Sequence, residues 1–163
     1  METSADEIIP GLWIGNKAAS TDREFLTKHR VTAVFNCTKN LIFDSTVKNQ
    51  YRVPLDDNLE PEEIRNMELW APEIAYKIAA EMRRTKAAGE AILVHCHAGM
   101  QRSAGSVAIY LIAIKGQTAD EAMAFIKKKR PITFTPRANF EKAIRGFDAM
   151  FARDIKPRLS AQF

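Results

Sequence analysis

A chain of 163 residues, with 46% hydrophobic and 27% charged residues, can bury the core of one globular domain and leaves little room for a second. Its 24 basic and 20 acidic residues give a net charge of +4, which suits an anionic substrate and is too small to indicate nucleic acid. Two cysteines and the lack of a signal-peptide pattern do not resemble a disulfide-framed secreted protein, and no 18-residue apolar stretch predicts a membrane-spanning helix. We expect a soluble intracellular chain, in the cytoplasm or alternatively in the nucleus.

The first sixty residues predict short elements. Their signals are alternation of apolar residues, β-branched runs and helix-capping patterns. In order, we expect two strands around a Pro-Gly turn (8–15), a helix opened by a capping box (21–30), a buried strand (31–37), a brief alternating strand (51–55) and a loop (56–61).

Helical patterns dominate the remainder. A long helical pattern follows residue 61 and ends at Gly89, and Pro72 implies either a kink or the start of the main helix there. The later elements are an apolar central strand (91–94), an apolar helix (103–115), a helix opened by a second capping box (118–129), and a final helix with Thr135 as N-cap, Pro136 at its first position and the apolar face Phe140, Ile144, Phe147 and Phe151.

Strands that alternate with helices in this order predict an α/β fold in which helices flank a mostly parallel central sheet. The elements fill one domain, residues 1–163, with a core at about 7–155 and a frayed tail at 156–163. Ligands bind such sheets beyond the carboxyl ends of the strands, next to helix N-termini.

The most informative stretch, His-Cys-His-Ala-Gly-Met-Gln-Arg-Ser at residues 95–103, lies between the central strand and the apolar helix. Successive backbone N–H groups in such a loop point inward and form an anion-sized nest. Gly99 permits dihedral angles that a larger residue would resist. We therefore expect an anionic group to bind against His97, Ala98, Gly99, Met100, Gln101 and Arg102.

Cys96 is the candidate nucleophile of this loop. A free thiol has a pKa of about 8.5, so only a small fraction is thiolate at neutral pH. The nest, the helix dipole and Arg102 should stabilise the anion, and a pKa lowered by about three units needs roughly 4 kcal/mol. The planar fork of Arg102 also matches two phosphoryl oxygens, and Ser103 can donate to the sulfur when a phosphoenzyme is hydrolysed.

The pattern His-Cys-x5-Arg-Ser resembles the signature of the protein tyrosine phosphatase superfamily, and its Ala-Gly pair resembles the dual-specificity branch. The resemblance covers about residues 7–150 and implies the fold of a small, atypical dual-specificity phosphatase. Three further segments carry it: the N-terminal hairpin (7–16), a strand ending in Asn-x-Thr (34–38) and a strand leading into the general-acid loop (51–57).

The resemblance implies a phosphoprotein phosphatase that hydrolyses phosphotyrosine and phosphoserine or phosphothreonine through a cysteinyl-phosphate intermediate on Cys96. It implies neither a metal nor another cofactor, because Arg102 takes the role of a cation. It also implies supporting roles for His95 and Asn36.

Two neighbouring carboxylates compete for the role of general acid. The family pattern places the acid three positions after Pro54, which selects Asp57. The alternation of the preceding strand also favours Asp57, and Asp56 remains the alternative.

Three residues depart from the pattern of the family or allow two interpretations. Gln101 stands where many relatives have Ser or Thr, and we expect it to alter the rim or to position water. Arg137 interrupts a Pro-Asn pair that is usual in the branch, and it can add positive charge near the cleft. Cys37 is either a small core residue or, as its counterpart in some relatives, a disulfide partner that protects Cys96 from oxidation.

Two other patterns have plainer interpretations. His95 and His97 flank Cys96, but no second ligand cluster accompanies them, so no metal site is predicted. The basic run 127–130 complements a helix C-terminus and stays solvated, or it docks an acidic partner.

Phosphorylated proteins are therefore the expected partners. An RNA 5′-phosphatase of the same superfamily is the alternative, although that subgroup usually carries His-Gly and Asn-Arg-Thr where this loop has Ala-Gly and Gln-Arg-Ser. A phosphoinositide phosphatase would place lysines in the loop, which has none. The third possibility is a module that captures phosphoproteins without turnover, against which the intact Cys96 and Arg102 argue.

Overall fold

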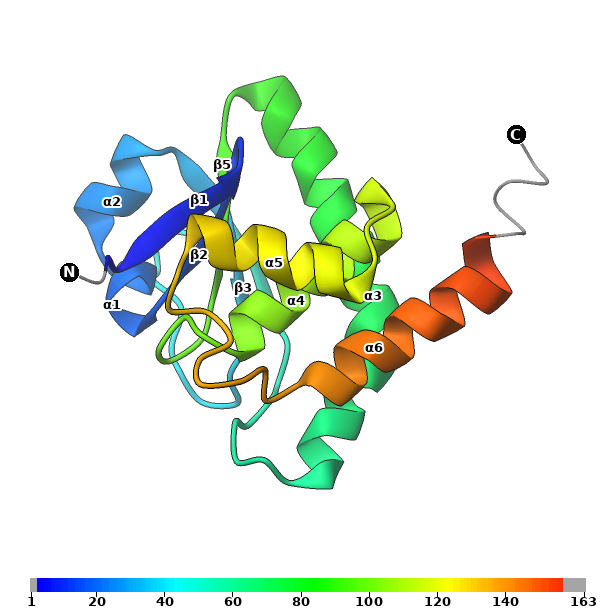
Figure 1. The fold of residues 1–163 in the computed structure, drawn as a ribbon. Coiled ribbons are helices and arrows are strands. Elements are labelled where there is room, and N and C mark those ends of the chain that lie inside the picture. The colour runs from blue at the N-terminus through cyan, green and yellow to red at the C-terminus, as the bar shows by residue number, and fades with distance from the viewer. Residues whose placement is uncertain (1–2, 157–163) are drawn as a thin grey trace.

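The computed structural model describes residues 3–156, so the expected tail lies, apart from Lys156, outside the described residues (Figure 1). The strands are β1 (Ala5–Ile9), β2 (Leu12–Gly15), β3 (Val31–Asn36), β4 (Asn49–Arg52) and β5 (Ala91–His95). The helices are α1 (Lys17–Ser20), α2 (Arg23–Lys28), α3 (Pro61–Ala88), α4 (Arg102–Lys115), α5 (Ala119–Lys129), α6 (Glu141–Met150) and the π-helical turn η1 (Phe151–Ile155).

The five strands form one sheet in the order β1-β2-β5-β3-β4. β5 lies at its centre, parallel to β2 and β3, and β1 alone among the described strands pairs antiparallel. This confirms the predicted mostly parallel sheet. In the register, His95 pairs with Gly15 on one side and with Asn36 on the other, so the segments after three strands meet at one edge.

Helices cover both faces of the sheet (Figure 1). Side chains alternate along β5: Ile92 and Val94 join the core with α3, α4, α5 and α6, whereas Ala91 and Leu93 join the smaller core with α1 and α2. Every residue of β5 is buried. The wholly apolar sequence of this strand follows from coverage on both sides, and its end is held in place between two packed layers.

Helix α3 runs without interruption through Pro72. Pro61 occupies its first position, where the missing N–H of proline leaves no hydrogen bond unmade. The possibility that the main helix begins at Pro72 is therefore wrong. The helix ends at Gly89, in the left-handed conformation that terminates many helices.

The capping predictions have mixed outcomes. The capping box at Thr118 is present and opens α5. At α2, the helix expected at 21–30, the side chain of Asp22 and not that of Thr21 caps the N-terminus, by accepting from the N–H of Phe25. The brief strand expected at 51–55 is β4, which begins earlier and ends at Arg52.

The expected start of the final helix at Thr135 and Pro136 is wrong. Helix α6 begins at Glu141, although the predicted apolar face is buried. The Thr135 hydroxyl donates to the carbonyl of Ile132 and so caps nothing, and the Thr135–Pro136 peptide bond is cis. Residues 135–139 form a loop that packs on the residues after β5. Within residues 3–156, no helix is long and apolar enough to cross a membrane.

Candidate active site

The loop between β5 and α4, residues 96–101, is called here the cysteine loop. Cys96 follows the carboxyl end of the central strand, and Arg102 is the first residue of α4. The loop borders a cavity of about 340 Å³. The cavity is lined by Asp57, Cys96, His97, Ala98, Met100, Gln101, Arg102, Thr135 and Asn139.

The carbonyl groups of the cysteine loop are held from outside. The carbonyl of His97 accepts from the N–H of Lys17 at 2.9 Å, and that of Met100 accepts from the N–H of Phe134 at 3.0 Å. Arg130 donates to the carbonyl of Gly99 at 2.8 Å and to that of Ala98 at 3.5 Å.

The N–H of a trans peptide points away from its carbonyl, so amides of this loop face the opposite side. Within residues 3–156, no backbone N–H from His97 to Gln101 donates to another group of the chain. These free donors lie in the loop where the sequence predicts an anion cradle.

Gly99 is required by the geometry of the loop. Its φ is +67°, in the region that favours glycine. A Cβ atom there would lie 2.7 Å from the carbonyl carbon and oxygen of Gly15 and 2.8 Å from a guanidinium nitrogen of Arg130. Both the backbone dihedral angles and the tight packing behind the loop therefore require glycine at position 99.

Cys96 and Arg102 both have contacts that suit phosphate chemistry. Cys96 is 2% exposed, and its Sγ lies 3.2 Å from the hydroxyl oxygen of Ser103. Nη1 of Arg102 donates to the carbonyl of Leu55 at 3.1 Å, which ties α4 to the segment before Asp57. Nε of Arg102 is buried without a partner among the described residues, so it remains available for a bound anion.

His95 is buried and supports the loop from within. Its Nδ1 lies 3.3 Å from the carbonyl oxygen of Cys96, a contact that requires the proton on Nδ1. Burial lowers the pKa of His95 to about 4, with a smaller contribution from the charges of Arg52 and Arg102, and the hydrogen bond to Cys96 opposes the shift. The ring is therefore neutral at physiological pH.

The structure distinguishes the two candidate acids by their partners. Asp56 forms an ion pair with Lys39 at 3.2 Å and lies outside the lining of the cavity. Asp57 lines the cavity with Cys96, and its Oδ1 accepts a hydrogen bond of 2.9 Å from Nδ2 of Asn139. The carboxylate that the spacing favoured is the one that shares a cavity with the thiol.

Gln101 lines the cavity, and the polar atoms of its side chain bond to the loop before α6. The residue is only 4% exposed, so little of its side chain faces solvent. Nε2 donates to the carbonyls of Thr135 and Arg137, and Oε1 accepts from the N–H of Asn139 at 2.9 Å. The amide thereby fixes the loop before α6 against the cysteine loop. Arg137 itself is exposed and lies outside the cavity lining.

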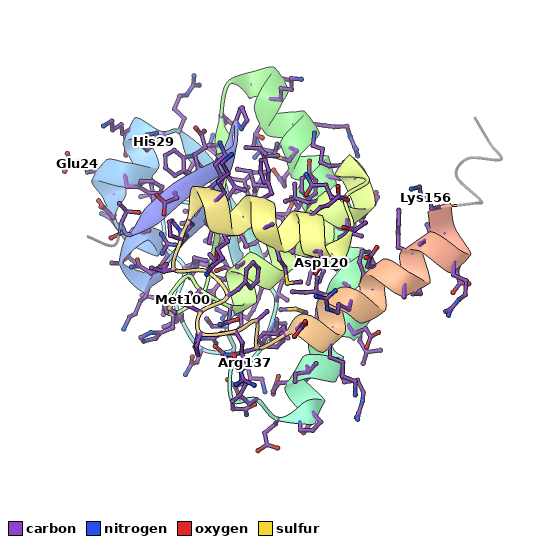
Figure 2. All side chains as sticks on the ribbon, in the orientation of Figure 1. Glu24, His29, Met100, Asp120, Arg137 and Lys156 are labelled. Atoms are coloured by element: carbon purple, nitrogen blue, oxygen red, sulfur yellow. The ribbon has the colours of Figure 1, made fainter. Side chains whose placement is uncertain are left out.

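Figure 2 shows Met100 and Arg137 at the same end of the molecule, where these two loops meet. His97, Ala98 and Met100 line the cavity, as expected for a loop that surrounds an anion. No group of three or more His, Cys, Asp or Glu side chains within residues 3–156 is arranged to hold a metal ion.

Asn36 and Cys37 lie at the end of β3, beside His95. Asn36 is buried; its Oδ1 accepts from the N–H and hydroxyl of Thr38, and its Nδ2 donates to the carbonyl of Leu41. It shapes the turn after β3. Cys37 is fully buried in the same apolar cluster as Cys96, and its N–H donates to the carbonyl of His95 at 2.8 Å. Both thiols are free.

Arg130 and Asn139 are functional candidates that sequence reasoning missed. The sequence predicts that the basic run 127–130 stays solvated or docks an acidic partner, yet Arg130 is 1% exposed. Its guanidinium group also bonds to Asp6 at 2.8 Å, so it joins the first strand to the cysteine loop. No local pattern separates it from the three exposed lysines before it. Asn139 could have been found, because it is the Asn of the interrupted Pro-Asn pattern and is followed by Phe140.

A sequence model of the family described as "Dual specificity phosphatase, catalytic domain" matches residues 12–149. Dual specificity protein phosphatase Mpk3 of Drosophila melanogaster is 29% identical over 147 residues, which are 88% of this chain and 34% of that protein. Dual specificity protein phosphatase 1 of Arabidopsis thaliana is 27% identical over 151 residues, 90% of this chain and 72% of that protein.

The fold is also similar to that of solved structures. The structure of DUSP15 has a TM-score of 0.78 at 22% sequence identity, with 98% of this chain and 96% of that chain covered. At this identity the likeness concerns the fold alone. The chain spans 22% to 40% of the length of the first three curated relatives that it matches.

Proposed function

The chain belongs to the dual-specificity phosphatase catalytic-domain family, and from that premise we propose that it hydrolyses phosphate monoesters on tyrosine and on serine or threonine of proteins. The observation that carries the proposal is the shared cavity of Cys96, Arg102 and Asp57, bordered by free backbone N–H groups. A nucleophile, an anion cradle and a proton donor thus border one site.

In the first step the thiolate of Cys96 attacks the phosphorus atom and an S–P bond forms. The P–O bond to the substrate breaks, and protonated Asp57 gives its proton to the leaving oxygen. The cradle and the unpaired Nε of Arg102 bind the equatorial oxygens of the transferring group, where negative charge is spread.

In the second step water attacks the cysteinyl-phosphate. Asp57, now ionised, accepts the proton of this water, the S–P bond breaks, and inorganic phosphate leaves with the thiolate restored. Ser103, 3.2 Å from Sγ, donates a hydrogen bond to the departing sulfur. Asp57 ends the cycle protonated, ready for the next substrate.

Phosphoproteins are favoured over RNA because the loop is Ala-Gly and Gln-Arg-Ser and has no positive side chain besides Arg102. Turnover is favoured over mere capture because nucleophile, arginine and acid are all present at the cavity. A reducing compartment, the cytoplasm or the nucleus, is the proposed location, because both cysteines are free thiols.

A panel of four substrates tests the proposal: a phosphotyrosine peptide, a phosphothreonine peptide, a 5′-triphosphate RNA and a phosphoinositide. We expect turnover of the peptides by the wild-type chain and none by Cys96→Ser, whose hydroxyl is a far weaker nucleophile. Peptide turnover by Cys96→Ser would contradict the covalent mechanism. RNA turnover far above peptide turnover would establish the alternative substrate class.

A further inference from the structure

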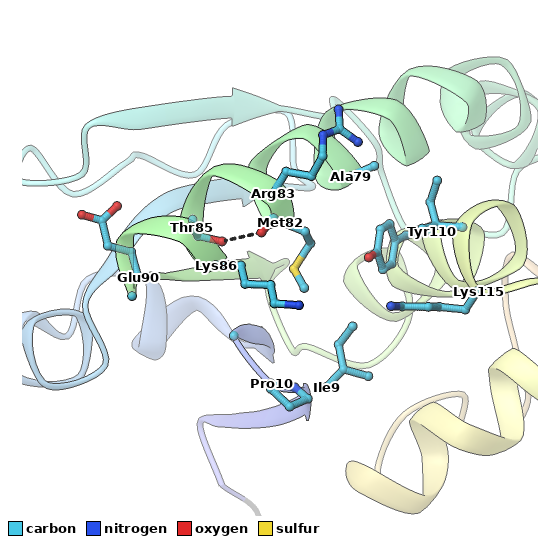
Figure 3. A pocket seen from close by; sticks show the side chains of 13 residues that line it. Ile9, Pro10, Ala79, Met82, Arg83, Thr85, Lys86, Glu90, Tyr110 and Lys115 are labelled. Atoms are coloured by element: carbon cyan, nitrogen blue, oxygen red, sulfur yellow. Dashed lines mark hydrogen bonds between the residues drawn. The ribbon is translucent and has the colours of Figure 1, made fainter.

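A second cavity, of about 640 Å³, lies at the opposite edge of the sheet from Cys96. Its walls are the last turns of α3 and α4 and the turn between β1 and β2 (Figure 3). Glu90 at this cavity precedes β5 and Cys96 follows it, so the five residues of the strand, about 16 Å, separate the two sites. Nothing in the proposed phosphatase reaction uses this cavity.

The interior of the cavity is aliphatic. Its apolar lining residues are Ile9, Pro10, Ala79, Met82 and Ile114. Ile114 is 48% exposed, so an apolar occupant of the cavity would remove part of its surface from water. The volume lies within the range of roughly 300–1,000 Å³ that is usual for small-molecule sites.

Three cations surround this aliphatic interior. Arg83, Lys86 and Lys115 line the cavity and are exposed, and none of them forms an ion pair with another residue in 3–156. Lys86 and Lys115 lie in the last turns of α3 and α4, where the helix dipoles account for part of their stabilisation. Arg83 lies before the last turn of α3, where the helix dipole stabilises a positive charge less.

The one carboxylate of the lining does not neutralise these cations. Oε1 of Glu90 already accepts from Arg84 at 2.8 Å and from the hydroxyl of Thr32 at 2.9 Å. These two partners hold the carboxylate of Glu90 at the end of α3, and Figure 3 shows it far from Lys115. The mouth of the cavity therefore has a net positive charge.

Tyr110 supplies a hydroxyl group that lines the cavity. The ring is buried, since the residue is 2% exposed, and the hydroxyl oxygen is not among the buried unpaired atoms of residues 3–156, so it can be hydrated when no ligand is bound. In Figure 3 the hydroxyl end of the ring points into the space between Met82, Lys86 and Lys115. Burial raises the pKa of Tyr110, against a smaller opposite effect of Arg83, so the hydroxyl is protonated and can donate.

We propose that this cavity binds an aliphatic carboxylate of the medium-chain fatty-acid class. The carboxylate accepts from Tyr110 and pairs with Lys86 and Lys115, and the alkyl chain replaces water against Met82 and Ile114. An alkyl body fits better than an aromatic one, because Tyr110 is the one aromatic residue of the lining and flexible Met and Ile side chains adapt to a chain.

Calorimetric titration of the whole chain with dodecanoate, below its micelle concentration, tests this site. Dodecyltrimethylammonium has the same chain and the opposite charge and is the matched ligand. We expect one saturable site for dodecanoate and no saturable binding of the cation. The binding does not depend on the proposed phosphatase activity, so a failure of either proposal leaves the other unaffected.

Variants of the lining residues show whether dodecanoate binds in this cavity. Dodecanoate affinity should fall about tenfold or more in Lys86→Ala/Lys115→Ala, and by about threefold to tenfold in Tyr110→Phe, which removes one hydroxyl. Lys48→Ala/Lys128→Ala removes the same charge from exposed positions outside the cavity and should leave the affinity unchanged. Methyl NMR of the wild-type chain needs no variant: the signals of Ile9, Met82 and Ile114 should shift on addition of dodecanoate.

Three results would overturn the proposal. They are the absence of saturable binding, an equal loss of affinity in the Lys48→Ala/Lys128→Ala control, and loss of binding in Arg102→Ala with no change in the cavity variants. The last result would place the carboxylate in the cysteine loop.

Discussion

Asn139 donates a hydrogen bond of 2.9 Å to the carboxylate of Asp57, so the loop before α6 holds the loop that carries the candidate acid. Gln101 in turn accepts from the N–H of Asn139. A residue next to Arg102 therefore positions the acid through one intermediate side chain. This chain of contacts leads to the first two predictions.

Asp57→Asn should lower kcat for phenyl phosphate by about 100-fold or more, since general acid catalysis is worth roughly 10²–10⁴-fold. The loss should be much smaller with 4-nitrophenyl phosphate, whose leaving group needs little protonation. Asp56→Asn is the matched control: it removes an ion pair with Lys39 and should leave both rates near those of the wild type. Equal losses in the two variants would refute the assignment of Asp57.

Gln101→Ala should lower both stability and kcat. It removes three hydrogen bonds of a buried amide and leaves backbone groups of residues 135–139 unpaired, which should reduce the free energy of unfolding by about 1–3 kcal/mol. Because the loop then no longer fixes Asn139, kcat should fall more than KM rises.

A double-mutant cycle identifies the route of the Gln101 effect. If Gln101 acts through Asn139, the losses of kcat in Gln101→Ala and Asn139→Ala will not add in the double variant. Additive losses would mean that Gln101 acts on the cysteine loop by another route.

Arg130→Met should lower kcat/KM strongly, because the carbonyls of Ala98 and Gly99 lose the group that holds them on the outer side of the loop. The free energy of unfolding should fall by about 1.5–3 kcal/mol, the usual effect of removing hydrogen bonds of a charged group, because the partner Asp6 is itself 27% exposed. Lys128→Met, in the same basic run but exposed, should change neither quantity. Asp6→Asn separates the two effects: it should lower stability and leave kcat/KM nearly unchanged.

The cysteine loop could be predicted because its information is local: one strand, nine residues and one helix define it. The contribution of Arg130 could not, because its partner Asp6 is 124 residues away and only the fold brings them together. The Thr-Pro pair at 135–136 gave a wrong prediction of the start of the final helix for a related reason. It has the composition of a helix start, but contacts with Gln101 keep this segment in a loop.

Stability should depend on pH through His95. Its pKa is lowered from 6.5 to about 4, mainly by burial, so between these values the unfolded chain binds a proton that the folded chain does not. Stability is therefore highest above pH 6.5 and falls by about 3 kcal/mol as the pH drops to 4, with no further loss from this residue below that. His95→Asn keeps a donor for the carbonyl of Cys96 and does not titrate, so urea unfolding should show a flatter pH profile. An unchanged profile would contradict the prediction.

Peroxide should join Cys37 to Cys96. Both thiols are buried in one cluster at adjacent ends of β3 and β5, and burial raises the pKa of Cys37 to about 12, so Cys37 remains a thiol. Peroxide oxidises the Cys96 thiolate to a sulfenic acid, and attack by Cys37 forms the disulfide with release of water. We expect a cross-linked 37–96 peptide by mass spectrometry and recovery of activity with dithiothreitol.

Cys37→Ser is the control, because it keeps the size of the side chain and removes the resolving thiol. In this variant peroxide should carry Cys96 on to sulfinic acid, and dithiothreitol should no longer restore activity. Equal recovery in both proteins, with no cross-linked peptide, would show that Cys37 is a core residue without a redox role. The high pKa of Cys37 makes disulfide formation slow, so the two proteins should differ most at low peroxide, when the sulfenic acid survives long enough to be captured.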